Sequence, residues 1–159
     1  MSKPKPPRIG VISDTHGHLV PAALEAFKGV DHIIHAGDIG GPEVLDRLSR
    51  LAPVTAVRGN MDAGPWASGL NPTEVIEVAS LLFYVIHDRV ALDLDPATAG
   101  FKAVIYGHTH QPASAIQDGV LFLNPGSASL PRRRHPPSVA VVRIQGKRLL
   151  PEFVPLENE

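Results

Sequence analysis

The chain has 159 residues, of which 43% are hydrophobic and 19% charged, and this length and composition are those of one globular domain rather than a disordered chain. Its 15 basic and 16 acidic residues nearly cancel, which argues against a protein built mainly to hold long nucleic acid or an anionic membrane. It has no cysteine and no run of the roughly 18 apolar residues that a membrane helix needs, so we expect no disulfide, no thiolate metal site and no membrane span, and a cytoplasmic location.

The first sixty residues alternate between strand and helix patterns. A Pro- and Lys-rich segment over residues 1–7 is expected to be a flexible arm. The sequence then predicts strands over 8–13, 31–36 and 54–59 and helices over 21–28 and 41–51. Each helix has a proline in its first turn, where proline is tolerated. This alternation predicts a parallel sheet.

The second half consists of strand patterns joined by tight turns. Strands are predicted over 73–79 and 81–87, with a turn at Ser80, and a further strand over 102–108. Two hairpins follow over 113–124 and 138–156, with turns at Asp118–Gly119 and at Gln145–Gly146. We therefore expect one α/β domain over residues 8–159, parallel in its front half and antiparallel in its back half.

Five of these strands end in side chains that can bind a metal. Ligands of open α/β sheets bind at the carboxyl ends of the strands, so the five ends are expected to converge. The side chains at these five ends that could bind a metal are Asp14, His16, His18, Asp38, Asn60, Asp62, His87, Asp88, His108 and His110. Oxygen and imidazole donors without thiolate suit divalent Mn, Fe or Zn. About seven ligands exceed the four of a tetrahedral zinc site and fit two ions about 3.5–4 Å apart that share a carboxylate.

Glycines stand beside these ligands, at Gly17, Gly37, Gly59 and Gly107. They are expected to let the chain turn sharply and to leave room for the ions.

Five ordered blocks carry a resemblance to a known family. SDTHG, GD, GNMD, a single His and GHTH, followed by NPGS, resemble the calcineurin-like metallophosphoesterase superfamily over about residues 9–131. The chain is most similar to its branch of small single-domain phosphodiesterases. The resemblance implies a four-layer αββα sandwich of two mixed β-sheets flanked by helices. It also implies two divalent ions, manganese first, with Fe, Zn, Ni and Mg as alternatives.

The resemblance further implies how the ligands divide between two metal sites that share Asp38. One site would comprise Asp14, His16, Asp38 and His110. The other would comprise Asp38, Asn60, His87 and His108. A hydroxide between the ions would attack phosphorus in line, and the implied catalytic residues are Asp38, Asn60 and His108.

Two positions depart from the family pattern. Asp88 follows His87 where members usually have glycine; aspartate tolerates left-handed backbone, so the turn can survive, and the side chain either supports a metal ligand or perturbs the second site. Met61 follows Asn60 where many larger members have a histidine that looks like the acid for the leaving group. A thioether cannot donate a proton.

The remaining polar residues have two interpretations each. Arg58, His18 and Arg132, the last in the basic segment PRRRH, are candidates for contact with a substrate phosphate, with a surface or salt-bridge role as the alternative. His35 is expected to be a packed, hydrogen-bonded core histidine. Asp62 is expected to accept hydrogen bonds within its loop rather than to bind a metal.

The preferred hypothesis is a two-metal phosphoesterase that cleaves a small-molecule phosphodiester. The alternatives are a noncatalytic protein-interaction scaffold of the same fold, like the retromer subunit of this branch, a phosphomonoesterase, and a nuclease limited to short oligonucleotides. The complete ligand set favours an enzyme over a scaffold. The sequence is compatible with a homo-oligomer.

Overall fold

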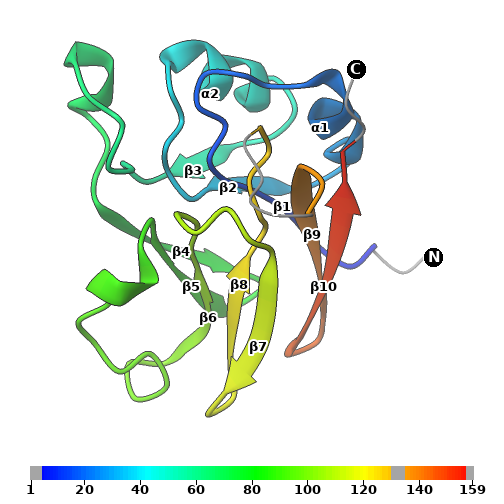
Figure 1. Ribbon diagram of the computed structural model, residues 1–159. Helices are drawn as coiled ribbons and strands as arrows, with labels where there is room; N and C mark the ends of the chain where they lie inside the picture. The colour runs from blue at the N-terminus through cyan, green and yellow to red at the C-terminus, as the bar shows by residue number, and fades with distance from the viewer. Residues whose placement is uncertain (1–4, 130–134, 157–159) are drawn as a thin grey trace.

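The computed structural model describes residues 5–129 and 135–156, and it confirms the predicted fold class: two mixed five-stranded sheets pack face to face (Figure 1). The first sheet has the order β10-β9-β1-β2-β3. Its strands are β1 (Arg8–Ile12), β2 (His32–His35), β3 (Val54–Ala56), β9 (Ser138–Gln145) and β10 (Arg148–Pro155). The second sheet has the order β4-β5-β6-β8-β7. Its strands are β4 (Thr73–Val78), β5 (Leu81–Ile86), β6 (Phe101–Ile105), β7 (Ala113–Gln117) and β8 (Val120–Asn124).

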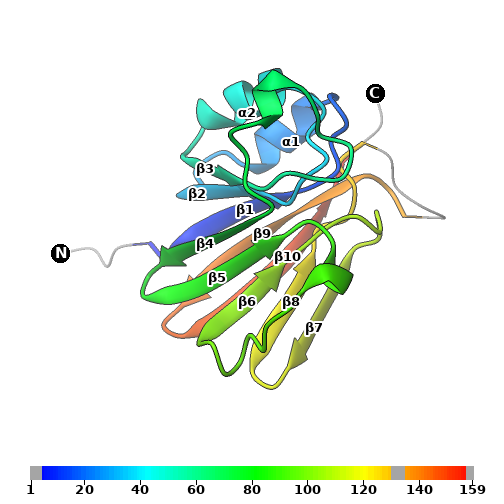
Figure 2. The ribbon, with the colours of Figure 1, turned by 90° about the vertical axis from the view of Figure 1, so that its left-hand side faces the viewer.

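Two α-helices cover the outer face of the first sheet. They are α1 (Pro21–Ala26) and α2 (Pro42–Ser49), and Figure 2 shows the strands of the first sheet between these helices and the second sheet. Both helices begin with the predicted proline. Phe27 packs with Val44 and Leu48 in the apolar layer beneath them. Helix α1 is shorter than predicted because the chain leaves the helix in a turn that ends at Gly29, with φ at +81°.

The expected division into a parallel front and an antiparallel back is wrong for the second sheet. Strands β5, β6 and β8 run parallel to one another, and only the outer pairs β4–β5 and β7–β8 are antiparallel. The chain crosses from β5 to β6 through the 3-10 turn η2 (Arg89–Ala91) and an irregular segment. Such a crossover brings the carboxyl ends of β5 and β6 to the same edge.

Local turn chemistry explains the hairpins. Ala79 and Ser80 have φ of 52° and 67°, and Asp118 and Gly119 have 52° and 79°, the left-handed pairs that two-residue hairpin loops require. The last hairpin turns one residue later than expected. Because Gln145 pairs with Arg148, its loop is Gly146–Lys147 rather than Gln145–Gly146.

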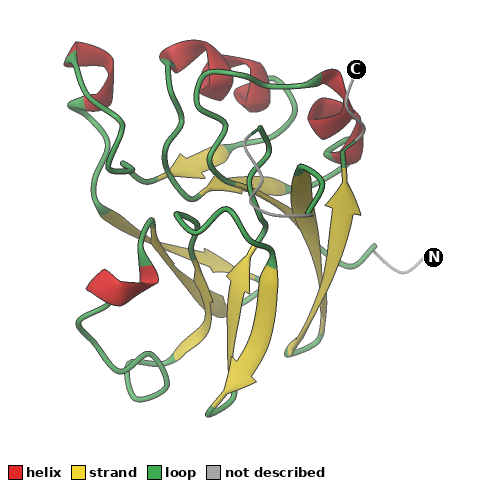
Figure 3. Ribbon diagram, in the orientation of Figure 1, coloured by secondary structure: helices red, strands yellow, loops and turns green. Residues whose placement is uncertain are grey.

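The apolar core lies between the sheets. Fully buried side chains from both sheets meet there, among them Val11, Ile34, Phe83, Ile105 and Val142. Within the described ranges, η2 and the following segment, rather than an α-helix, cover the outer face of the second sheet, as Figure 3 shows. The expected outer layer on this side is therefore largely irregular chain.

The ends of the described chain test the remaining fold predictions only in part. Much of the expected arm over residues 1–7 lies outside the described residues, and the carbonyl of Pro7 accepts a hydrogen bond of 2.9 Å from the Ile144 amide. None of the helices in the described part of the chain has the length and apolarity needed to cross a membrane.

Candidate metal centre

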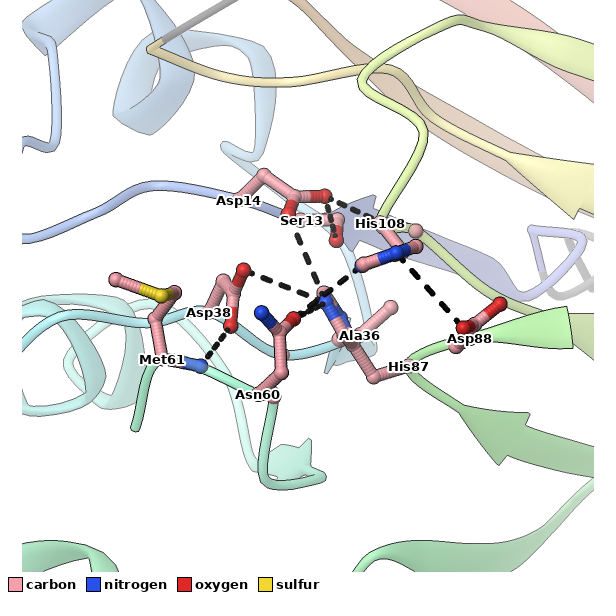
Figure 4. A network of polar contacts seen from close by, with 12 residues as sticks. Ser13, Asp14, Ala36, Asp38, Asn60, Met61, His87, Asp88 and His108 are labelled. Carbon is pink, nitrogen blue, oxygen red and sulfur yellow. Dashed lines mark hydrogen bonds and ion pairs between the residues drawn. The ribbon is translucent and has the colours of Figure 1, made fainter. Parts of the chain in front are cut away.

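Two groups of side chains at the carboxyl ends of the strands lie close enough to hold one metal ion each. Asp14, His16 and His110 form the first group, and Asp14, Asp38 and His87 form the second; in each, the ligand atoms lie within 4.8 Å of one another. Asp14 Oδ1 is 3.3 Å from His110 Nε2 and 3.9 Å from His16 Nε2. His87 Nε2 is 3.4 Å from Asp38 Oδ2 and 3.9 Å from Asp14 Oδ1, and Figure 4 shows these side chains converging.

Asn60 and His108 extend the second group. The Oδ1 atom of Asn60 lies 3.0 Å from His87 Nε2 and 3.2 Å from His108 Nδ1. Asn60 follows β3 and His108 follows β6, so the two sheets meet at this point. All seven predicted ligands therefore lie in one cluster, and their assignment to individual ions stays a prediction.

The member common to both groups is Asp14, whereas the resemblance implies that Asp38 is shared. One oxygen of Asp38, Oδ1, accepts a hydrogen bond of 2.8 Å from the Met61 amide, and the other faces His87. Asp14 Oδ1 faces imidazoles of both groups. The geometry of the described residues thus gives Asp14 contacts with both groups and gives Asp38 contacts with the second group.

The carboxylate of Asp14 shows that these residues fit a cation. Among the buried side-chain oxygen and nitrogen atoms of the described residues, Asp14 Oδ1 is the one that lacks a hydrogen-bond partner. Its Oδ2 accepts hydrogen bonds from Ser13 Oγ at 2.6 Å and from the His108 amide at 3.1 Å. An unsatisfied buried acceptor costs about 1–3 kcal/mol, and more when it is charged. A divalent ion held by Asp14 and its neighbouring imidazoles would remove this cost.

The hydrogen bonds of His87 orient it as a ligand. Its Nδ1 donates to the carbonyl of Ala36 at 2.7 Å, which leaves Nε2 directed at Asp38 and Asn60. Metal-binding histidines commonly have such a partner on the other ring nitrogen. Burial lowers the pKa of His87, but the carboxylates of Asp38 and Asp14 and the Ala36 carbonyl outweigh it and raise the pKa overall. A proton on Nε2 thus competes with a cation for the same oxygens.

Five of the predicted ligands have left-handed backbone. Positive φ values occur at Asp14 (56°), His16 (49°), Asp38 (55°), His108 (71°) and His110 (64°). This region is uncommon for residues other than glycine, and such strain concentrates at functional sites. The segments that follow β1 and β2 are held together, because the amides of Asp14 and His16 donate hydrogen bonds of 3.0 Å each to the carbonyls of Gly37 and Asp38.

The neighbouring glycines confirm one expectation and contradict the other. The chain turns sharply at Gly17 and Gly37, with φ of +81° and +103°, but the space beside Gly59 and Gly107 is not open. A Cβ atom at Gly59 would overlap Asp38, and one at Gly107 would overlap Ser13 Oγ and lie 2.7 Å from Asp14 Oδ2. The space beside these glycines is thus filled by the ligands and their partners rather than left open for ions.

Asp62 is a loop acceptor, as predicted. Its carboxylate accepts hydrogen bonds from the amides of Ile39 and Gly59 at 2.9 Å and of Gly40 at 3.1 Å. These bonds tie the loop after β2, which carries Asp38, to the loop after β3. Asp62 therefore fixes the relative position of two ligands without facing the cluster of donors.

His35 is a core histidine, as predicted. It is fully buried, and its Nδ1 accepts a hydrogen bond of 3.1 Å from the Gly37 amide. Because the hydroxyl of Thr15 donates to the Ile39 carbonyl, the 3.0 Å contact requires His35 Nε2 to donate to Thr15 Oγ1. Burial and the nearby His87 lower the pKa of His35 to about 3, so it remains neutral.

The backbone at Asp88 differs from the expectation. Its φ is −114°, so the left-handed turn is not formed, because the side chain instead caps η2 by accepting from the Val90 amide at 3.1 Å. Asp88 Oδ2 lies 3.8 Å from His108 Nε2. This position beside a predicted ligand favours the supporting role over the perturbing one.

The candidate substrate contacts lie in different places. Arg58 is exposed and lines a cavity of about 550 Å³ together with Asn60, His87 and His108. His18 is exposed on the loop after β1 and is not among the described residues that line this cavity. Arg132 lies outside the described residues.

The NPGS block has a supporting function that the sequence alone did not reveal. The hydroxyls of Ser127 and Ser129 both donate to the Asp14 carbonyl at 2.9 Å. Asn124 Nδ2 donates to the Gly107 carbonyl at 3.1 Å and to Thr109 Oγ1 at 3.0 Å. These bonds hold the loops of Asp14 and of His108, and the resemblance of this block to the family was the one signal for them.

Comparison with known proteins agrees with this geometry. Residues 8–147 match the model of the calcineurin-like phosphoesterase superfamily domain. A probable metallophosphoesterase of Methanothermobacter thermautotrophicus is 37% identical over 158 residues, covering 92% of this chain and 91% of that protein. The structure of a novel archaeal phosphodiesterase is 27% identical, with a TM-score of 0.77 over 92% of this chain and 99% of that one. Vps29 of Entamoeba histolytica in complex with zinc is 27% identical, with a TM-score of 0.72 over 93% and 98%. This chain therefore belongs to the calcineurin-like phosphoesterase superfamily.

Proposed function

We propose that this protein hydrolyses phosphodiesters with the help of two divalent metal ions. The observation that carries the proposal is the buried oxygen of Asp14 without a hydrogen-bond partner, which lies among six further side chains with nitrogen and oxygen donors where the two sheets meet. The similarity to an archaeal phosphodiesterase supports the class of substrate. The nitrogen and oxygen donors suit manganese, with Fe, Zn, Ni and Mg as alternatives.

The ligands divide by position. His16 and His110 would hold the first ion with Asp14, and Asn60, His87 and His108 would hold the second with Asp38. When bound, such a pair neutralises phosphate charge and lowers the pKa of a coordinated water. Arg58, at the adjoining cavity, would bind a phosphate oxygen through its guanidinium.

Neither Met61 nor Asp62 is suited to protonate the leaving group of the ester. The side chain of Met61 is 67% exposed beside Asp38 and has no proton to give (Figure 4). The carboxylate of Asp62 is occupied by three backbone amides. We therefore expect low turnover on alkyl esters and better turnover on activated aryl diesters. A diester also brings one negative charge rather than about two toward Asp14 and Asp38.

The test compares bis-p-nitrophenyl phosphate with p-nitrophenyl phosphate on protein loaded in turn with Mn, Fe, Zn, Ni and Mg. We expect faster hydrolysis of the diester and no activity after chelation. A preference of tenfold or more for the monoester would contradict the diesterase proposal and favour a phosphomonoesterase. Short oligonucleotides belong in the same panel, because they test the nuclease alternative.

The second candidate function is a protein-interaction scaffold. The similarity to Vps29, a vacuolar protein sorting protein that was solved with zinc, favours it. A metal-loaded protein that hydrolyses none of these esters would support the scaffold over the enzyme.

A further inference from the structure

We propose that the cavity beside the metal centre holds an uncharged, ring-bearing ester arm of the substrate. This inference rests on the proposed phosphodiesterase function and names the class of diester. The cavity has a volume of about 550 Å³, and the predicted ligands Asn60, His87 and His108 are among the residues that line it. An ester whose phosphate lies at the centre would thus extend one arm directly into the cavity.

One wall of the cavity is apolar and rigid. Tyr84 and Ile86 are alternate residues of β5 and lie on the same face of the strand, three residues and one residue before His87. The ring of Tyr84 is held edge-on to Phe101, with centroids 5.2 Å apart and planes at 66°. Pro72 and Ala91 add further apolar surface. A wall whose side chains are already fixed costs little to order when a ring binds.

The turn that carries Ala91 is anchored to the second sheet. The guanidinium of Arg89 lies 4.1 Å from the ring centroid of Phe122, and its Nη2 donates to Gln117 Oε1 at 3.0 Å. Asp88 caps the same turn at the Val90 amide. The cavity is therefore preformed, which is usual for small-molecule sites.

The size and charge of the cavity select the arm. Its volume falls within the roughly 300–1,000 Å³ of small-molecule sites and far exceeds the need of a methyl ester. Among the described residues, Asp88 and Asp93 line it together with the guanidinium of Arg58, which the phosphate would engage. A further anionic group on the arm would face these two carboxylates, so the favoured arm is neutral.

The test uses two neighbouring tryptophan substitutions. Ala91→Trp fills the cavity from an exposed position, whereas Val90→Trp changes a residue on the same turn that is 92% exposed and outside the cavity lining. Binding of phenylphosphonate and of methylphosphonate to the manganese-loaded proteins is measured by calorimetry. We expect at least tenfold tighter binding of phenylphosphonate in the wild type and in Val90→Trp, and less than a threefold difference in Ala91→Trp.

Three results would overturn the inference. They are equal affinity of the wild type for the two phosphonates, a phenyl preference that survives in Ala91→Trp, and a preference lost equally in Val90→Trp. Binding of 4-carboxyphenylphosphonate as tight as that of phenylphosphonate would overturn the proposal that the arm is neutral.

Hydrolysis of bis-p-nitrophenyl phosphate is measured separately. Diesterase activity without a phenyl preference overturns the inference alone, whereas a phenyl preference without diesterase activity overturns the proposed reaction alone.

Discussion

Replacing Asp14 by asparagine should stabilise the metal-free protein and remove its response to metal. In the wild type, the buried Oδ1 of Asp14 has no hydrogen bond and lies 3.3 Å from His110 Nε2. An asparagine can keep its oxygen on the Ser13 hydroxyl and the His108 amide, and direct its NH₂ group at the imidazoles. The substitution thus removes a buried charge that lacks a hydrogen bond and, with it, a predicted metal ligand.

The magnitude follows from the cost of that oxygen. An unsatisfied buried acceptor costs about 1–3 kcal/mol, and the melting temperature of a domain of this size changes by about 2–4 °C per kcal/mol, so metal-free Asp14→Asn should melt about 2–12 °C above metal-free wild type. Manganese at 100 times its dissociation constant should stabilise the wild type by about 2.7 kcal/mol and the variant by much less. Thermal unfolding followed by circular dichroism, with chelator and with manganese, measures both effects.

Asp62→Asn is the matched control. This carboxylate is also buried, but three backbone amides already satisfy it, so its loss should lower the melting temperature with and without metal. If metal-free Asp14→Asn melts below metal-free wild type, or if it keeps the full manganese shift, Asp14 is not a charge that awaits a cation. The metal-centre assignment would then fail at its main support.

Three further predictions address the bridge, the core and the leaving group. If Asp38 bridges, Asp38→Ala should lose both ions and more activity than Asp14→Ala, and elemental analysis of metal per chain decides, since the reverse pattern would make Asp14 the shared ligand. The pKa of His35 is about 3 in the folded protein, against an ordinary value of 6.5, so the unfolded chain binds more protons than the folded protein below pH 6.5. The free energy of unfolding should therefore fall as the pH drops from 6.5 toward 3, and the fall should reach about 2 kcal/mol at pH 5. Urea unfolding of metal-free protein at pH 7 and 5 should show a smaller fall in His35→Gln, and an equal fall would contradict this account. Met61→His should raise turnover of diesters with poor leaving groups by at least about tenfold, and a variant that keeps its ions without that gain would refute the missing-acid interpretation.

The sequence predicted the ligand cluster because each ligand follows an apolar strand and the strand ends meet at one edge. It could not predict the direction of β6, because an extended segment has the same local pattern whether its neighbour is parallel or antiparallel. Direction depends on the crossover through η2, whose residues carry no helical pattern. The sequence also could not predict the conformation of Asp88, because it is compatible both with a left-handed turn and with a side-chain hydrogen bond to the Val90 amide, which the structure forms. The cavity depended on tertiary contacts, since the packing of Arg89 on Phe122 joins the turn η2 to the distant strand β8.

Without a metal ion, the fold must hold the predicted ligands in an energetically unfavourable arrangement. Five predicted ligands have left-handed backbone, and the buried Oδ1 of Asp14 has no hydrogen-bond partner. Three sets of hydrogen bonds oppose this cost from outside the ligand set: Asp62 joins the loops of Asp38 and Asn60, Ser127 holds Asp14, and Asn124 holds the loop of His108. Because these bonds do not depend on a metal, they keep the ligands in place before any ion arrives. The centre is therefore preorganised by its supporting residues, and an arriving ion relieves the electrostatic cost that remains.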